Sequence, residues 1–358
     1  MTSTNVSAEY GAQTLSEILS QPERWTASLR KLASSTELQR AVERARPGAE
    51  WLFVGCGTSY YLAIAAASAF HHLGLPARAV PGSEILLYPG LSLPPGREYI
   101  PIVISRSGRT SEAVRAAHLL EKERDLRTIA ITCADGEMLE AEASLTLKLL
   151  DADELSTVMT RSFTSMLLGL QYLGAKIAGD EKLCSALMQL PNEAAPLLAD
   201  IPQRLRLFIE SRDVDDCIFL AQGRLFGVAS ECMLKMTESS CTYAQVFHSL
   251  EFRHGPKSIV SPDTLLTFLI SDTSYDAEVE LLEEMKKLGA VTLVIANRLD
   301  ARAGKYSDFA IELGLTVPEF ARPAAYTMWG QLAGVYHGLK KGLNPDSPKN
   351  LTRVVELQ

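Results

Sequence analysis

The chain has 358 residues, 47% of them hydrophobic and 22% charged, with a formal net charge of −8. This composition can fill two domain cores, which argues against a disordered chain. The acidic balance and the lack of a basic stretch argue against a nucleic-acid partner. No apolar run reaches the roughly 18 residues of a membrane span.

Residues 1–4 are polar and lack the apolar segment of a secretory signal. The six cysteines are scattered and form no CxxC pair. They therefore predict reduced thiols in the cytoplasm and no zinc cluster.

The first half of the chain alternates helical segments with short apolar runs. A helical segment at 14–38 opens it, and an alanine-rich helix at about 60–73 follows the first strand. The expected strands are 50–54, 77–80, 99–104, 127–132 and 145–149. Apolar runs of four to six residues between helices predict parallel strands that are covered on both faces.

The same alternation returns in the second half. Strands are expected at 216–221, 264–270, 291–296 and 309–313, and helices at 226–239 and 277–288. Gly55 and Gly223 lie 168 positions apart, and Ser105 and Ser271 lie 166 apart. Two landmarks with nearly the same offset predict a tandem duplication of one α/β unit, joined by a linker within 185–210.

Two polar loops follow strands of the first half, where parallel sheets bind ligands. Glycines let the backbone of these loops approach an anion, and hydroxyl side chains stand at the start of the next helix. The candidate phosphate ligands are Gly57, Thr58, Ser59, Ser105, Ser107, Gly108 and Thr110. Neither loop has the lysine of a nucleotide-binding loop, so the pattern predicts a phosphomonoester site. The alternative is a pair of ordinary turns and helix caps.

A third polar segment, 156–165, precedes an apolar helix. The serine and threonine side chains of this segment either cap that helix or close over the phosphate. In the second case Thr160 is a further candidate phosphate ligand.

Acid–base candidates come from the second half. Glu231, Lys235 and Glu238 share one helical face at i, i+4 and i+7. This spacing is either a surface ion pair or a catalytic group; apolar neighbours and the preceding strand-to-helix turn favour catalysis. His254 lies in a loop bounded by glycine and proline, and is either structural or an acid–base group.

Phosphosugar chemistry gives each candidate a role. Opening the ring needs an acid–base group that titrates near neutrality, which suits His254. Moving a proton between C1 and C2 needs a carboxylate, which suits Glu238. Glu231 or Lys235 would hold hydroxyls or stabilise the enediol charge, and no metal is needed.

These motifs resemble the sugar isomerase (SIS) domain family in its tandem form. The resemblance is to the isomerase half of glutamine–fructose-6-phosphate aminotransferases and to stand-alone tagatose-6-phosphate ketose/aldose isomerases. It runs from about residue 29 to the end of the chain. The segments that carry it are 55–59, 105–110, 231–238, 250–256 and 344–352.

The resemblance implies an α/β fold of two tandem doubly wound parallel-sheet SIS subdomains, three-layer α/β/α and flavodoxin-like. It implies an N-terminal helical segment at 1–30, SIS subdomain 1 with the phosphate loops at 31–190, and SIS subdomain 2 with the catalytic Glu and His at 200–342. A tail at 343–358 would close over the site.

The resemblance also implies roles for residues. The hydroxyls of both loops would hold the sugar phosphate, Glu238 would move the proton, and His254 would reach the site from the partner subunit of a homodimer. No cofactor is implied. Glutaminase activity should be absent, since the second residue is Thr2 rather than a catalytic cysteine.

The tail and one loop depart from the family pattern. Arg353 stands where the aminotransferases carry a Schiff-base lysine, with Lys349 nearby, and the high pKa of arginine forbids that chemistry. Arg109 stands where they carry an acid and predicts a more cationic phosphate site.

Three functions remain open. The first is aldose–ketose isomerisation of a hexose 6-phosphate or an aminohexose 6-phosphate, the latter with loss of ammonia. The second is a deglycase that releases an amine from a fructosamine 6-phosphate. The third is a non-catalytic sugar-phosphate sensor that regulates a partner. The Glu238 and His254 pair favours an enzyme.

Overall fold

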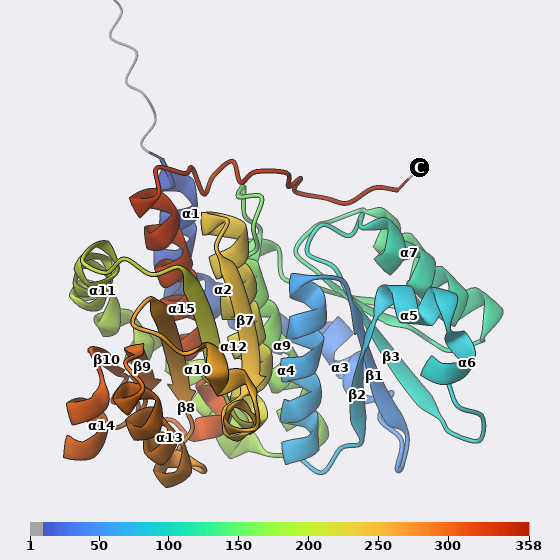
Figure 1. Ribbon diagram of the computed structural model, residues 1–358. Helices are drawn as coiled ribbons and strands as arrows, with labels where there is room; N and C mark the ends of the chain where they lie inside the picture. The colour runs from blue at the N-terminus through green and yellow to red at the C-terminus, as the bar shows by residue number, and fades with distance from the viewer. Residues whose placement is uncertain (1–9, 358) are drawn as a thin grey trace, which may run out of the picture.

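Two separate parallel sheets, one from each half of the chain, organise the molecule (Figure 1). The computed structural model describes residues 10–357. Residues 1–9, which include Thr2 and the start of the helical segment expected at 1–30, and residue 358 lie outside it. The first sheet consists of β1 (Glu50–Gly55), β2 (Ala77–Pro81), β3 (Tyr99–Ile104), β4 (Ile129–Thr132) and β5 (Leu145–Lys148). The second consists of β6 (Asp216–Ala221), β7 (Tyr243–His248), β8 (Thr264–Ile270), β9 (Val291–Ala296) and β10 (Phe309–Glu312).

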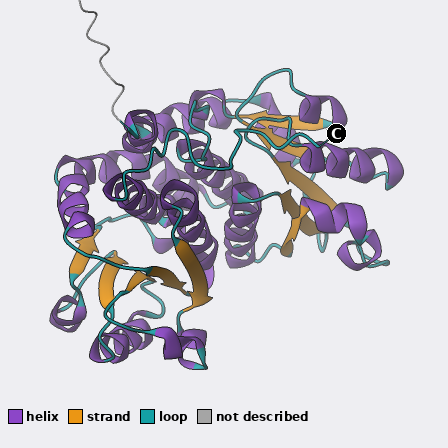
Figure 2. Ribbon diagram, turned by 45° about the horizontal axis from the view of Figure 1, so that its top comes forward, coloured by secondary structure: helices purple, strands orange, loops and turns teal. Residues whose placement is uncertain are grey.

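Both sheets have the same strand order. The first runs β2-β1-β3-β4-β5 and the second, read from its other edge, β7-β6-β8-β9-β10. This is the 2-1-3-4-5 order of flavodoxin-like folds. Helices cover both sheets and fill the space between them (Figure 2). The predicted tandem α/β/α fold is therefore confirmed.

The helices follow the predicted alternation. Those of the first half are α1 (Ala12–Leu19), α2 (Gln21–Ala33), α3 (Thr36–Val42), α4 (Thr58–His72), α5 (Gly82–Leu87), α6 (Pro89–Ser92), α7 (Ser111–His118), α8 (Met138–Glu142), α9 (Arg161–Ile177) and α10 (Glu181–Ala194). Those of the second half are α11 (Ile201–Glu210), α12 (Phe226–Ser240), α13 (Tyr275–Lys287), α14 (Ala301–Tyr306) and α15 (Pro323–Lys340). None of the helices within residues 10–357 is both long and apolar enough to span a bilayer.

Two elements differ from the sequence-based expectation. The helical segment expected at 14–38 is three helices, and the hydroxyl of Ser35 caps the third by accepting from the N–H of Leu38. Strand β7 was not predicted at all. It is an edge strand whose residues are only half-buried, so its sequence lacks the continuous apolar run that identifies a central strand.

Helix α12 packs closely between α4 and α15 because glycines remove side chains from both contacts. A Cβ on Gly334 of α15 would lie 2.8 Å from the carbonyl oxygen of Lys235, and one on Gly338 would lie 2.2 Å from that of Ser239. A Cβ on Gly227 of α12 would lie 2.6 Å from the backbone nitrogen of Ala65 in α4. Glycine is thus required at these close approaches.

Helices α4 and α12 are antiparallel. The start of α12 meets the middle of α4 at Gly227 and Ala65, while Lys235, near the end of α12, donates to Thr58 at the start of α4 at 3.1 Å. Each helix also runs antiparallel to the strand before it. The carboxyl edge of the first sheet therefore adjoins the amino edge of the second.

The residues after α15 hold the first helix in place. The Asp346 carboxylate accepts from the backbone N–H groups of Gln13 and Thr14 at 3.1 and 2.8 Å, and the Asn344 side chain accepts from the N–H of Gly11 at 3.0 Å. The tail then runs across the molecule towards α7 (Figure 1).

We expect Gly338→Ala to lower the free energy of unfolding by about 1–3 kcal/mol, because the added methyl group meets the backbone of α12. Gly304→Ala in α14 is the matched control, since a Cβ there meets no atom within 4 Å. The control should stabilise the protein by about 0.5–1 kcal/mol. Urea unfolding measures both changes, and equal stabilities of the two variants would contradict the close contact.

Candidate active site

A cavity of about 260 Å³ opens at the carboxyl edge of the first sheet, where it adjoins α12 and the C-terminal tail. Loops after β1, β3 and β5 form its walls. The lining residues are Cys56, Gly57, Thr58, Ser59, Arg106, Ser107, Thr110, Glu112, Thr157, Met159, Glu238, Thr352, Arg353 and Val355. The cavity therefore brings together loops of the first repeat, a helix of the second and the end of the chain.

Most of the predicted phosphate ligands meet in this cavity. Gly57, Thr58, Ser59, Ser107 and Thr110 line it. The hydroxyl of Ser105 does not line the cavity but reaches that of Thr110 at 3.4 Å.

The backbone supports a phosphate site at these loops. Gly57 adopts a φ of 56°, in the left-handed region that favours glycine, directly before α4 begins. Helix α7 begins beside the second loop at Ser111. Two helix N-termini and several hydroxyls thus face one cavity, an arrangement that suits an anion.

Two predicted ligands lie elsewhere. The backbone of Gly108 bends away with a φ of 65°, against Glu137. Thr160 is buried, and its hydroxyl donates to the Glu154 carboxylate at 2.8 Å at the start of α9. In this structure Thr160 occupies the N-cap position of α9 without a capping bond from its side chain, and it does not line the cavity.

Lys235 is buried between the two predicted carboxylates of α12. Its Nζ forms an ion pair with Glu238 and lies 3.4 Å from Oε1 of Glu231. Glu231 and Lys235 are almost fully buried, whereas Glu238 reaches the cavity. The three side chains are thus not a surface ion pair.

Burial sets the protonation of this cluster. It raises the pKa of the Glu231 carboxyl to about 8, although the charge of Lys235 opposes the shift. Burial alone would lower the pKa of Lys235, but the two carboxylates outweigh it and raise that pKa. Lys235 therefore stays charged beside Glu238 and can stabilise negative charge that develops in the cavity.

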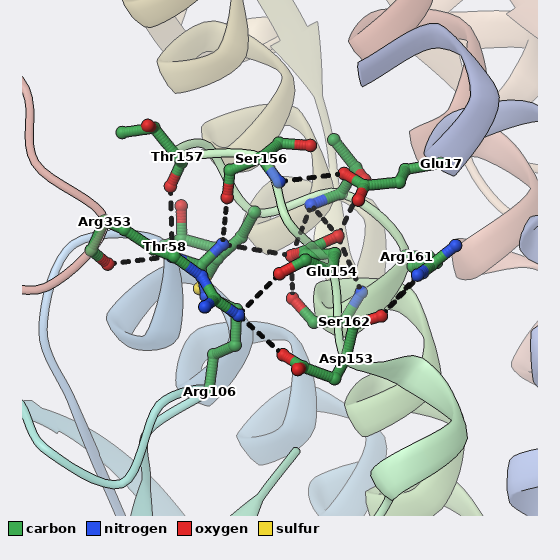
Figure 3. Close-up of polar contacts among 12 residues, drawn as sticks. Glu17, Thr58, Arg106, Asp153, Glu154, Ser156, Thr157, Arg161, Ser162 and Arg353 are labelled. Atoms are coloured by element: carbon green, nitrogen blue, oxygen red, sulfur yellow. Dashed lines mark hydrogen bonds and ion pairs between the residues drawn. The ribbon is translucent and has the colours of Figure 1, made fainter. Parts of the chain in front are cut away.

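Arg106, which lines the cavity, takes part in a network of buried polar contacts (Figure 3). Its guanidinium pairs with the fully buried Glu154 at 3.3 Å and donates to the carbonyl oxygens of Ser156 and Thr157, both at 3.0 Å. Glu154 in turn accepts from the N–H of Thr160 and pairs with the hydroxyl of Ser162. These bonds fix the wall formed by residues 153–160.

Of the two basic tail residues named from the sequence, Arg353 lines the cavity and Lys349 does not. Arg353 donates to the Asp153 carboxylate at 2.8 Å, and Lys349 is exposed outside the cavity. Arg109 pairs with Glu356 at 2.6 Å and lies 3.9 Å from Glu137. Its charge is therefore offset by carboxylates, in contrast to the more cationic phosphate site expected from sequence.

His254 lies far from Glu238 within one chain. It is exposed and follows β7 at the carboxyl edge of the second sheet, whereas Glu238 lies where β7 begins. The six residues of β7 separate these edges by roughly 20 Å.

At the carboxyl edge of the second sheet, side-chain carboxylates of the protein accept hydrogen bonds from the loop that follows β8. Glu278 is buried and accepts from the N–H of Ser271 and the hydroxyl of Ser274 at 3.0 and 2.8 Å. Glu319 accepts from the N–H of Asp272 at 3.0 Å. The donors of this loop are thus used internally, unlike those of the first repeat.

Sequence reasoning missed several residues of the cavity. Arg106, Glu112, Thr157, Met159 and Thr352 line it without having been named as site residues. A signal existed for Arg106, which stands between two predicted serine ligands. Glu112 stands in the first turn of α7, directly after the second phosphate loop. Thr157, Met159 and Thr352 were identifiable only once the 153–160 loop and the tail were placed.

Comparison with known proteins gives a consistent result. A model of the SIS domain matches residues 50–175 and 212–333. The chain is 26% identical over 354 residues to glutamine–fructose-6-phosphate aminotransferase [isomerizing] of Pyrobaculum aerophilum, covering 96% of this chain and 57% of that protein. The chain spans about half the length of the curated relatives it matches.

Two solved structures share the fold. Glucosamine-6-phosphate deaminase of Thermotoga maritima is 30% identical, with a TM-score of 0.78 over 97% of this chain and 100% of that one. Tagatose-6-phosphate ketose/aldose isomerase of Escherichia coli is 22% identical, with a TM-score of 0.85 over 97% of this chain and 96% of that one. At this identity the second likeness concerns the fold alone.

We expect Lys235→Met to lower the free energy of unfolding by about 3–5 kcal/mol at pH 9, because it removes the buried cation that stabilises the ionised carboxylates of Glu231 and Glu238. The raised pKa of Glu231 means that its stabilising contribution is present below pH 4.5 and is lost as the pH rises through about 8. The loss in Lys235→Met should therefore shrink at pH 5, where Glu231 takes up a proton.

Urea unfolding at the two pH values measures this difference. Adding Glu231→Gln should recover most of the stability at pH 9. Lys287→Met, which removes an exposed lysine paired with Glu283, is the control and should cost less than about 1 kcal/mol. A loss independent of pH would contradict the assignment to Glu231.

Proposed function

The chain belongs to the SIS domain family, and we propose from its site that it is a phosphosugar aldose–ketose isomerase that acts on an aminohexose 6-phosphate and releases ammonia. One observation carries the proposal. The Glu238 carboxylate faces the same cavity as the hydroxyl-rich loops at Thr58 and Thr110. A phosphate held by the loops brings the carbon chain of a sugar towards this base.

The proposed chemistry requires one base and a stabilised charge. Glu238 removes the C2 proton of the open-chain 2-amino aldose, and Lys235 beside it stabilises the negative charge of the enolamine oxygen. Return of the proton to C1 gives the C2 imine. Water then adds to the imine, ammonia leaves, and a ketose 6-phosphate remains.

Two findings favour an aminosugar over other substrates. The 30% identity to a glucosamine-6-phosphate deaminase extends over nearly the whole chain. The cavity of about 260 Å³ lies below the roughly 300–1,000 Å³ typical of sites for drug-sized ligands. A single phosphosugar suits this space better than the larger fructosamine adduct that a deglycase would take.

The position of His254 supports a site shared between subunits. Because His254 and Glu238 lie at opposite edges of the second sheet, His254 cannot reach the cavity of its own chain. We propose that His254 enters the cavity of a second copy in a homodimer and assists ring opening there.

We expect the wild-type chain, incubated with glucosamine 6-phosphate in D2O, to release ammonia and to incorporate deuterium into the product. Glu238→Gln should reduce both rates by a factor of about 10²–10⁴, because the variant lacks the base. Proton NMR and an ammonia assay measure the two events, and calorimetry measures substrate affinity, which should stay near wild type.

Glu181→Gln, which changes an exposed carboxylate paired with Lys176, is the control and should react normally. Deuterium incorporation without ammonia would indicate simple isomerisation. Release of amine from a fructosamine 6-phosphate alone would indicate a deglycase. Binding without exchange in the wild type would indicate a sensor.

We expect chains carrying Glu238→Gln and chains carrying His254→Ala to be inactive alone on the ring form of the substrate. Mixing them after mild dissociation should restore part of the activity, because one site of each hybrid dimer has both residues intact. Ammonia release after mixing measures this complementation. Activity that stays absent while hybrid dimers are present would contradict the shared site.

A further inference from the structure

The loop between β3 and α7 contacts two different parts of the molecule. On one side Ser107 and Thr110 line the cavity. On the other side the same loop binds the C-terminal tail, which passes over that cavity. Phosphate ligands and tail contacts therefore alternate along a single stretch of seven residues, 105–111.

Three residues of this stretch hold the tail. Arg106 donates to the carbonyl oxygen of Arg353 at 2.8 Å, and Arg109 pairs with Glu356. The N–H of Ser111 donates to the carbonyl of Val355 at 3.1 Å, and its hydroxyl accepts from the N–H of Leu357 at 2.9 Å. The tail is thus bonded along its last residues to the loop that carries the phosphate ligands.

Arg106 is the buried member of this set. Its side chain is only 4% exposed, and Glu154 offsets its charge. Its fork of N–H groups reaches the carbonyls of three residues at once, Ser156, Thr157 and Arg353 (Figure 3). With the Glu154 carboxylate the guanidinium has four acceptors, which exceeds the three donors of a lysine ammonium.

The backbone of Arg106 is fixed as well. Its carbonyl oxygen accepts from the N–H of Cys133 at 3.0 Å and from the hydroxyl of Thr132 at 3.1 Å. The residue between the two serines therefore cannot shift independently of the sheet edge. A shift of the loop therefore also moves the side chain of Arg106, which contacts both the tail and the wall formed by residues 153–160.

We propose that Arg106 is a positioning residue that links phosphate binding at Ser107 and Thr110 to docking of the tail over the cavity. Of the proposed function, this inference requires only that the cavity binds a phosphate group. Because such linkage is reciprocal, a bound phosphate stabilises the docked tail, and a docked tail tightens phosphate binding to the same extent.

The test uses full-length Arg106→Lys, which keeps a cation beside Glu154 but loses the fork. Hydrogen exchange at the amides of Ser111 and Leu357, the two N–H groups that bond across the contact, reports tail docking. Titration with inorganic phosphate reports affinity. In the wild type, phosphate should slow exchange at both amides. Arg106→Lys should speed exchange and weaken phosphate binding about tenfold.

A double-mutant cycle separates linkage from a local effect on the loop. Truncating the chain after Thr352 removes the carbonyl that accepts from Arg106 and the tail partners of Arg109 and Ser111. If Arg106 acts through the tail, Arg106→Lys should weaken phosphate binding much less in the truncated chain than in the chain with its tail. Arg302→Lys, an exposed arginine paired with Glu283, is the control and should change neither readout.

Several outcomes would overturn the proposal: no phosphate binding to the wild type, unchanged exchange in Arg106→Lys, or fully additive losses in the cycle. With glucosamine 6-phosphate as substrate, Arg106→Lys should raise KM about tenfold and leave kcat within about twofold. Absent turnover with intact phosphate–tail linkage would overturn the proposed reaction and leave this inference standing.

Discussion

Helix α12 touches α4 on one side and α15 on the other, and glycines at Gly227, Gly334 and Gly338 bring the backbones into contact. This packing fixes the direction in which the two repeats meet. Since α4 and α12 are antiparallel, the end of α12 lies beside the start of α4. Lys235 and Glu238 of one repeat therefore reach the phosphate loops of the other, and the cavity depends on this single crossing.

The two repeats share a strand order but have diverged at their ligand-binding edges. In the first repeat, hydroxyls and helix N-termini face an open cavity. In the second, Glu278 and Glu319 accept from the N–H groups of Ser271 and Asp272, so the same kind of loop is satisfied by the protein itself. The first repeat thus supplies the ligand-binding edge, and the second repeat supplies helix α12, which completes the cavity.

Much of this could be predicted from sequence because it depends on local patterns. Buried runs such as Thr264–Ile270 identify central strands, and hydroxyls after a strand identify the cradle. Strand β7 was missed because a half-buried edge strand lacks such a run. Glu238 was predicted from a turn that precedes α12, at the far end of that helix. That Glu238 and Thr58 line one cavity depends on the crossing of α4 and α12, which only packing determines.

The anchoring of α1 by Asn344 and Asp346 affects the order in which the chain folds during synthesis. The first sheet closes with β5, at Lys148, long before the ribosome has added the tail. Domains fold in the order in which they emerge. Helix α1 must therefore wait for partners more than 300 residues downstream, and the cavity gains Arg353 only after the strands of both sheets have been synthesised. A nascent chain can therefore complete its binding site only after both repeats have been synthesised.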